Sequence, residues 1–309
     1  MSDLELLVGP DDAGERLDAV LVARAGLPSR AAAQRLLEEG AVSVDGQRRL
    51  KGFRVSTGER LLVTRAEEGP SARGDVPFEI VFEDDHLLVV DKPAGVVVHP
   101  APGTREPTLA DALRDRTAGG PSVRQGLVHR LDRDTSGLMA LAKSERAYEG
   151  LQAMIRAHEV TREYLTLVAG SPDADEGTVD APIGRDRMRR TVVSTRSDRA
   201  RAAVTHFRVL ERLDFTSLLR VRLETGRTHQ IRAHLAAIGN PVCGDRRYGG
   251  RECGARLGLE RQFLHSATLM FSHPIAREIV RCESKPPADL RRALDAARRE
   301  PVSGGPDGG

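Results

Sequence analysis

A short segment at residues 126–137, "GLVHRLDRDTSG", concentrates side chains that could do chemistry. It holds His129, Asp132 and Asp134 between an apolar run and a turn rich in Thr, Ser and Gly. An ionised carboxylate can attack an electrophilic carbon or accept a proton, so either aspartate is a candidate catalytic group. The same residue types also build ordinary turns, and for residues 134–137 a turn is the simpler interpretation.

Two hydrolase interpretations fit the chain poorly. "DRDTS" is close to the Asp-x-Asp-x-Thr signature of haloacid dehalogenase phosphatases, but its threonine stands one position early and no apolar strand precedes it. His229 and His234 are five residues apart, which places them on different sides of a helix rather than on one metal-facing stripe. We therefore expect no metal site. The three cysteines, which are spaced irregularly, are expected to be free buried thiols: Cys243, Cys253 and Cys282.

A second segment, "TGRTHQIRAHLAAIGNP", predicts a turn followed by a helix that Thr228 could cap. The apolar residues predicted to form the buried face of this helix are Ile231, Leu235 and Ile238. Arg227 and Arg232 would flank its N-terminus, where they could bind a phosphate or a carboxylate across a cleft. Two solvated arginines fit this segment equally well.

Buried elements are expected on both sides of the aspartate segment. "FEIVFED" and "HLLVVDK" predict strands, and the apolar run of the second is typical of a strand buried on both faces. Leu127 and Val128 are expected to end a strand, and "LMALAKS" to form the next one. Ser144 would cap the helix "ERAYEGLQAMIRAH". The aspartates would then lie in a loop on a rigid scaffold, where catalytic side chains are commonly placed.

Composition places few limits on function. The chain has 309 residues, 39% of them hydrophobic, which is enough for a buried core. Its net charge of +2 does not indicate a polyanion partner. An arginine-rich segment at residues 185–212 could contact phosphates or could be a solvated loop. No apolar run is long enough to span a membrane, and the N-terminus is acidic rather than signal-like. We expect a cytoplasmic protein.

The N-terminal part of the chain predicts a small unit at residues 15–65. Two helices, the second between Ser29 and Gly40, are followed by a hairpin that turns at Asp45-Gly46. The basic residues expected on its exposed side are Arg30, Arg35 and Lys51. Residues 66–77 lack periodicity and predict a linker, and residues 301–309 predict a disordered tail.

The order "RLDAVLV…SRAAAQRLLEEGAVSVDGQ" resembles the S4 RNA-binding module over about fifty residues. Asp45 stands at a position where asparagine is common in that module. The resemblance implies that this small α/β unit contacts RNA, with Arg30, Arg35 and Lys51 as substrate-binding residues.

Several motifs downstream resemble, in this order, the RluA family of RNA pseudouridine synthases: "VDKPAGVVVHP", "GLVHRLDRDTSGLMALAKS", "REYLTLVAG", "TGRTHQIRAHL", "NPVCGDRRYG" and "FLHSATLMFSHP". The resemblance implies a catalytic domain at residues 78–290. The expected fold is α+β, with a mostly antiparallel mixed sheet, flanking helices and a cleft across the middle. The implied reaction is isomerisation of uridine to pseudouridine in structured RNA, with large-subunit ribosomal RNA as the expected substrate.

The resemblance also implies roles for particular residues. Asp132 would be the catalytic group, acting either as a nucleophile or as a base on the sugar, and Arg232 would pair with it. Tyr164 would stack on the target uracil, and Arg130 would occupy the space that the flipped nucleotide leaves. Arg162 stands where lysine is frequent, and His129 and Thr135 would brace the loop. No cofactor or metal is implied, and we expect a monomer; the alternative is a non-catalytic RNA-binding or ribosome-assembly protein with the same fold.

Overall fold

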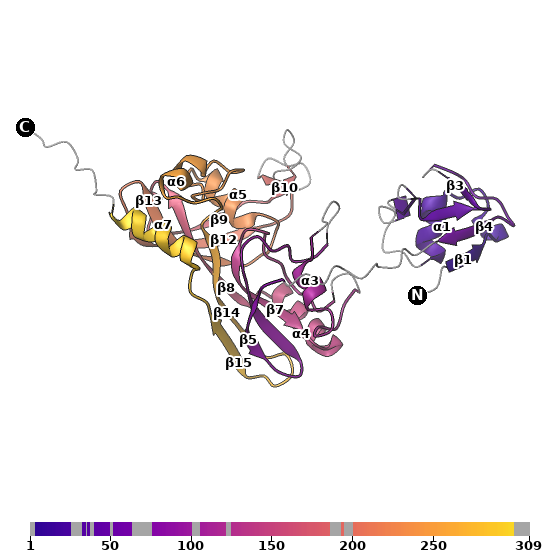
Figure 1. Cartoon of the computed structure of the whole chain (residues 1–309), viewed down its shortest axis with the longest axis horizontal. Coiled ribbons are helices and arrows are strands. Elements are labelled where there is room, and N and C mark those ends of the chain that lie inside the picture. Colours follow the sequence, from indigo (N-terminus) through magenta and orange to yellow (C-terminus); the bar gives the residue numbers. More distant parts are fainter. Residues whose placement is uncertain are drawn as a thin grey trace, which may run out of the picture. The chain divides into compact units, whose positions relative to one another are not determined.

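The computed structural model describes residues 4–25, 33, 34, 36, 37, 40–49, 52–63, 76–100, 106–121, 125–185, 193, 194 and 200–299. Contacts divide the chain into two compact units, Met1–Ser71 and Ala72–Gly309 (Figure 1). The predicted tail, most of the predicted linker, and the basic residues Arg30, Arg35 and Lys51 lie outside the described residues. The predicted domain bounds therefore stay predictions.

The first unit packs a helix against a four-stranded antiparallel sheet of order β1-β4-β2-β3. Its elements are β1 (Leu4–Leu7), the 3-10 helix η1 (Pro10–Asp12), α1 (Leu17–Arg24), β2 (Val42–Val44), β3 (Gln47–Arg48) and β4 (Arg60–Val63). The predicted hairpin joins β2 to β3, where Asp45 and Gly46 both have positive φ. Strand β1 lies before the predicted start of this unit and pairs with β4.

The second unit is built on one nine-stranded sheet, in the order β5-β6-β7-β14-β8-β13-β12-β9, with β15 paired to β14. The bounds of these strands are β5 (Glu79–Glu83), β6 (Leu87–Lys92), β7 (Ser136–Ala142), β8 (Thr161–Ala169), β9 (Glu176–Asp180), β12 (Val204–Arg212), β13 (Thr216–Leu223), β14 (Leu264–Ser272) and β15 (Ile279–Glu283). All pairs are antiparallel except β7 with β14, which confirms the expected mixed, mostly antiparallel sheet. A separate ribbon pairs β10 (Gly184–Arg185) with β11 (Val193–Ser194).

Both faces of the sheet are covered. Along β6, Leu88 and Val90 belong to one hydrophobic core, while Leu87 and Val89 belong to the other, as the apolar run predicted. Strand β7 is buried along its whole length. Gly137 is needed where β7 meets β14, because a Cβ at this positive-φ position would collide with the backbone of Ser266.

Helices complete the two cores. They are α3 (Leu109–Ala112), α4 (Glu145–Arg156), α5 (Gln230–Ala237), α6 (Arg251–Arg256) and α7 (Ala288–Arg299). Ser144 caps α4 by accepting from the backbone of Ala147, as predicted, and α4 packs against the core that includes β7 (Figure 1). Helix α7 packs its residues Leu290, Ala293 and Ala297 into the other core.

Three local predictions were wrong. Leu127 and Val128 do not end a strand: Leu127 makes only an isolated bridge to Leu141, because the chain turns at Gly126. Thr228 does not cap α5; the capping position is His229, which adopts the left-handed conformation with φ of 54°. Ile238 is 40% exposed because it follows the last turn of α5 rather than belonging to its buried face.

The cysteine prediction was wrong for one pair. Cys243 and Cys253 form a disulfide, whereas Cys282 is free and buried as expected. Glycines allow the pairing, because a Cβ on Gly254 would collide with the backbone of Gly244. The close approach of α6 to the preceding loop brings the two thiols together. The spacing of the cysteines in the sequence does not predict this approach.

Candidate active site

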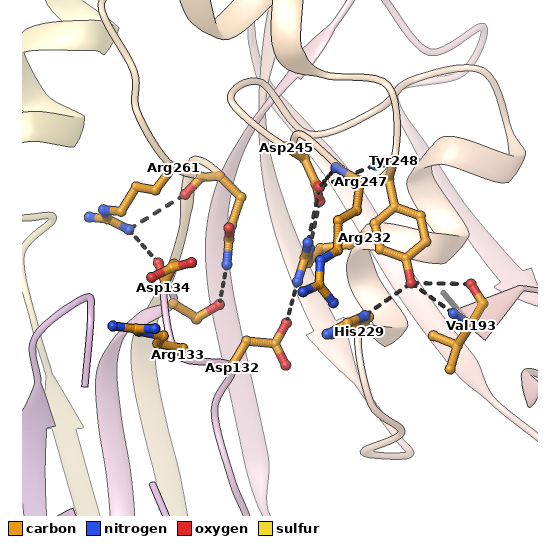
Figure 2. Close-up of polar contacts among 12 residues, drawn as sticks. Asp132, Arg133, Asp134, Val193, His229, Arg232, Asp245, Arg247, Tyr248 and Arg261 are labelled. Carbon is orange, nitrogen blue, oxygen red and sulfur yellow. Dashed lines mark hydrogen bonds and ion pairs between the residues drawn. The ribbon is translucent and has the colours of Figure 1, made fainter. Parts of the chain in front are cut away.

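The loop that carries Asp132 is held by its backbone from two sides. The ammonium of Lys92 and the backbone N–H of Gly95 both donate to the carbonyl of Arg133, at 2.9 and 3.0 Å. On the other side, Arg261 Nη1 donates to the carbonyl of Asp134 at 2.9 Å (Figure 2). The second aspartate therefore contributes its backbone to the loop, in keeping with its interpretation as a turn residue.

Arg232 connects this loop to α5 and to the segment after it. Its Nη1 donates to Asp132 Oδ2 at 2.9 Å, while Nε and Nη2 donate to the two oxygens of Asp245 at 2.5 and 3.0 Å (Figure 2). Burial works to lower the pKa of Arg232, but the bonds and charge of Asp245, together with the charge of Asp132, outweigh burial and raise that pKa. The structure thus brings together the two residues that the resemblance paired.

Asp245 is itself held by the backbone of the residues that follow it. Its side chain is 0% exposed and accepts from the backbone N–H groups of Arg247 and Tyr248. The guanidinium of Arg232 lies over the ring of Tyr248, 5.1 Å from the ring centroid. The hydroxyl of Tyr248 contacts Nδ1 of His229 at 3.0 Å and both backbone polar groups of Val193 (Figure 2). The Arg232 guanidinium is therefore enclosed by fixed partners.

Tyr164 lies on β8, which neighbours β14 and β13 in the centre of the sheet. It is 5% exposed and lines the same cleft as Asp132. Burial raises the pKa of its hydroxyl, against the charge of Arg162 and a hydrogen bond with Ser266. The hydroxyl is therefore held in its protonated form at neutral pH, and the ring is the part available to a substrate.

His129 and Thr135 brace the loop, as expected. His129 Nε2 accepts from the backbone N–H of Ala140 in β7 at 3.0 Å, and burial, with a smaller contribution from the charge of Arg162, lowers the pKa of His129 to about 3. The imidazole is therefore neutral near pH 7. Thr135 Oγ1 accepts from the side chain of Gln262 at 3.3 Å.

A cleft of about 660 Å³ contains the five described site residues that the sequence predicted: Asp132, Tyr164, Arg232, Arg130 and Arg227. Arg130 and Arg227 are exposed at its edge, and Arg227 Nε donates to the carbonyl of Ala202. Arg30, Arg35 and Lys51 belong to the other unit and remain outside the described residues. In the part of the chain that the structure describes, no three His, Cys, Asp or Glu side chains could hold a metal ion.

Comparisons with known proteins agree with this architecture. The model of the RNA pseudouridylate synthase family matches residues 86–237, and the S4 domain model matches residues 15–61. An uncharacterized RNA pseudouridine synthase of Mycobacterium bovis is 42% identical over 97% of this chain and 100% of its own. A ribosomal large subunit pseudouridine synthase D of Xanthomonas campestris is 40% identical over 97% of this chain and 94% of its own. This chain belongs to the RNA pseudouridine synthase family.

Solved pseudouridylate synthase structures share the fold of most of this chain. Human RNA pseudouridylate synthase domain containing 4 superposes with a TM-score of 0.57 at 27% identity, covering 71% of this chain and 93% of that one. Human RNA pseudouridylate synthase domain containing 1 superposes with a TM-score of 0.56 at 28% identity. The chain is accordingly an RNA-modifying isomerase with an S4 domain. None of the described helices is both long and apolar enough to cross a membrane.

Sequence reasoning about this pseudouridine synthase missed Asp245 and Tyr248. Both stand in the quoted motif "NPVCGDRRYG", so the signal was present, but the motif alone does not indicate which partner each side chain has. The structure shows that they hold Arg232 from the side opposite Asp132.

Proposed function

We propose that this pseudouridine synthase isomerises specific uridines in large-subunit ribosomal RNA, with Asp132 as its catalytic residue. The observation that carries the proposal is the Asp132 carboxylate itself, which is paired to Arg232, 16% exposed, and located in a cleft beside Tyr164. Asp132 would act on the ribose of the target nucleotide, either by attacking C1′ or by taking a proton from the sugar. Both routes need the carboxylate held in one orientation, which the hydrogen bond from Arg232 provides.

The other cleft residues have roles in binding the flipped nucleotide. A base inside a helix is not reachable, so the target nucleotide must swing out of its stack before it reacts. We propose that Tyr164 stacks on the uracil and that Arg130, exposed at the edge of the cleft, enters the space that the nucleotide vacates. Arg227 would contact the RNA backbone nearby.

Ribosomal RNA as the substrate is supported by two features. The S4 domain supplies a second RNA-binding unit, and Arg30, Arg35 and Lys51 are its proposed phosphate contacts. The relatives from Xanthomonas and Nitrosomonas are named as acting on the ribosomal large subunit, at 40% and 41% identity. Pseudouridine mapping in ribosomal RNA from cells with and without the protein tests this substrate; unchanged maps would exclude it.

The role of Asp132 is tested with RNA tritiated at uridine C5. Reattachment through C5 displaces the hydrogen at that carbon, so label should reach water in proportion to the pseudouridine formed. Asp132→Asn keeps the shape but removes the charge, and we expect it to release no label while binding RNA with unchanged affinity. Asp134→Asn is the matched control and should remain active. Activity of Asp132→Asn above a tenth of wild type would assign the chemistry elsewhere.

Two other outcomes would overturn the reaction itself. Free uracil and abasic sites in place of pseudouridine would make the protein a glycosylase. If wild-type protein released no tritium from naked ribosomal RNA or from assembling subunits, a non-catalytic role in RNA binding or ribosome assembly would explain the fold better.

A further inference from the structure

Arg162 is a buried cation beside the proposed uracil-stacking residue. It stands two residues before Tyr164 on β8, so both side chains project from the same face of the strand. Arg162 is only 4% exposed, and it lines the same cleft as Tyr164 and Asp132. Its small exposed part is therefore available to a molecule bound there.

This arginine has no anionic partner among the described residues. Its Nη2 donates to the backbone carbonyl of Glu224 at 2.9 Å, and its buried Nε has no hydrogen-bond partner in that part of the chain. The carboxylate of Glu224 is directed elsewhere, since it pairs with His206 at 2.6 Å. A buried charge is costly unless it is paired, so this guanidinium needs an anion that the described protein does not supply.

The two guanidinium groups of Arg232 and Arg162 differ in their partners. Arg232 is shared by Asp132 and Asp245, so two carboxylates face a single cation. The charge of Arg162 has no such match among the described residues, and it acts on Tyr164 and on His129, whose imidazole is neutral. Of these two arginines, Arg162 is therefore the one whose charge is available to an anion bound beside Tyr164.

Building on the proposed function, we propose that Arg162 binds the departing uracil as an anion. When the bond from C1′ to N1 breaks, its electron pair stays on the base and its negative charge spreads to O2 and O4. A guanidinium N–H of Arg162 donates to one of these oxygens. Asp132 meanwhile bonds to C1′ or takes the proton that the sugar loses. The charge of Arg162 is thus placed where negative charge develops, which is the most effective place for a fixed cation.

The same contact remains useful in the second half of the reaction. Uracil has to turn so that C5 faces C1′, and it can do so only if it stays in the cleft as an anion. The C5–C1′ bond then forms with an electron pair of the base, while the Asp132–C1′ bond breaks or, on the other route, the proton held by Asp132 returns to the sugar. The C5 proton then leaves to solvent and N1 takes up a proton, which restores the ring. Holding the anion by its oxygens keeps it from diffusing away without fixing which ring atom faces the sugar.

A leaving-group test distinguishes this role from general RNA binding. Fluorine at C5 withdraws electrons, so 5-fluorouracil departs as a more stable anion than uracil. Arg162→Gln should slow single-turnover cleavage of the C1′–N1 bond in uridine RNA by about 100-fold, in the range found for loss of one stabilising donor. With 5-fluorouridine at the target position the defect should shrink at least tenfold, while RNA affinity changes less than threefold. The readout is consumption of the target nucleoside in RNA digests.

Two further variants make the outcome decisive. Arg208→Gln removes one exposed positive charge from β12 outside the cleft, and so measures the general effect of losing a cation. Arg162→Lys keeps the cation without the planar fork, and we expect it to retain most of the cleavage rate. If Arg162→Gln does not fold, the smaller defect of Arg162→Lys must itself shrink on the fluorinated RNA. Equal defects on both RNAs, or a loss confined to affinity, would overturn the proposal; inactive wild-type protein would instead overturn the proposed function.

Discussion

Arg232 directs Asp132 because Asp245 fixes the orientation of the guanidinium. Two of the three guanidinium nitrogens of Arg232 donate to Asp245, which is wholly buried and held by backbone N–H groups. The direction in which the third nitrogen, Nη1, donates is therefore fixed. A guanidinium fork held in this bidentate way has little freedom to rotate. Asp245 is therefore a positioning residue for Asp132, acting through Arg232.

Removing Asp245 should affect both stability and turnover. Asp245→Ala leaves Arg232 buried with one partner fewer, and we expect the free energy of unfolding in urea to fall by about 3–5 kcal/mol. Asp245→Asn preserves the shape and should cost less, but its tritium release should also fall because the orientation of Arg232 is loosened. Asp175→Ala is the matched control, since Asp175 also pairs with an arginine but is 85% exposed. That variant should lose under about 1 kcal/mol; an equal loss in both would contradict the argument.

At the residue scale, sequence patterns identified the important side chains better than the residues that each of them contacts. The family resemblance implied that Asp132 pairs with Arg232, and the two side chains are hydrogen-bonded in the structure. The disulfide of Cys243 and Cys253 and the left-handed cap at His229 were missed. The disulfide depends on the close approach of α6 to the loop before it, and His229 contacts Tyr248 in that same loop. Neither a cysteine spacing of ten residues nor a single histidine carries that information.

At the scale of elements, the end of β6 sets the position of the aspartate loop through one side chain. Lys92 is wholly buried, and its ammonium donates to the carbonyls of Pro93, Val96 and Arg133 at 2.7–3.0 Å. The turn after β6 and the loop before β7 are thus fastened to the same ammonium. Burial, opposed by the charge of Asp134, lowers the pKa of Lys92 to about 7.

This shift predicts a rise of stability with pH. Between pH 7 and the unfolded value of 10.5 the unfolded chain binds a proton that the folded chain has released, so stability increases as pH rises. The stabilisation is fully present above 10.5 and is lost as pH falls through about 7. The contribution is at most about 1.4 kcal/mol per pH unit. Urea unfolding between pH 6.5 and 9.5 should show this slope in wild type but not in Lys92→Met. Parallel curves for the two proteins would mean that the shift is absent.

Element types were easier to predict than their order in the sheet. The apolar runs that became β6 and β7 were recognised because a strand buried on both faces leaves a continuous apolar segment. The insertion of β14 between β7 and β8 could not be deduced from the letters. It depends on a glycine at residue 137 that lets two backbones approach, and a glycine in a sequence does not say which strand comes near it.

For the whole molecule, the division into two units predicts that the second one folds alone. A chain lacking residues 1–71 should keep its own cooperative thermal transition, because each unit is compact by itself. Its RNA affinity should weaken, and the slope of log affinity against log salt should become shallower, by about 0.9 for each duplex phosphate that the shortened protein no longer neutralises. Filter binding across a salt series measures this. An unchanged slope would mean that the S4 domain does not contact the RNA.

The parallel pairing of β7 with β14 has a consequence for when this enzyme becomes active during its synthesis. Asp132 and Arg232 are separated by 100 residues, and the side chains of Ser136 and His265 that meet at the strand pair are separated by 129. Contacts of such long range form late, because the intervening chain must first be ordered. A ribosome-bound chain that ends before β14 therefore carries the complete aspartate motif without the sheet that supports it. Activity should appear only after β14 has left the exit tunnel, well after the S4 domain is free to fold.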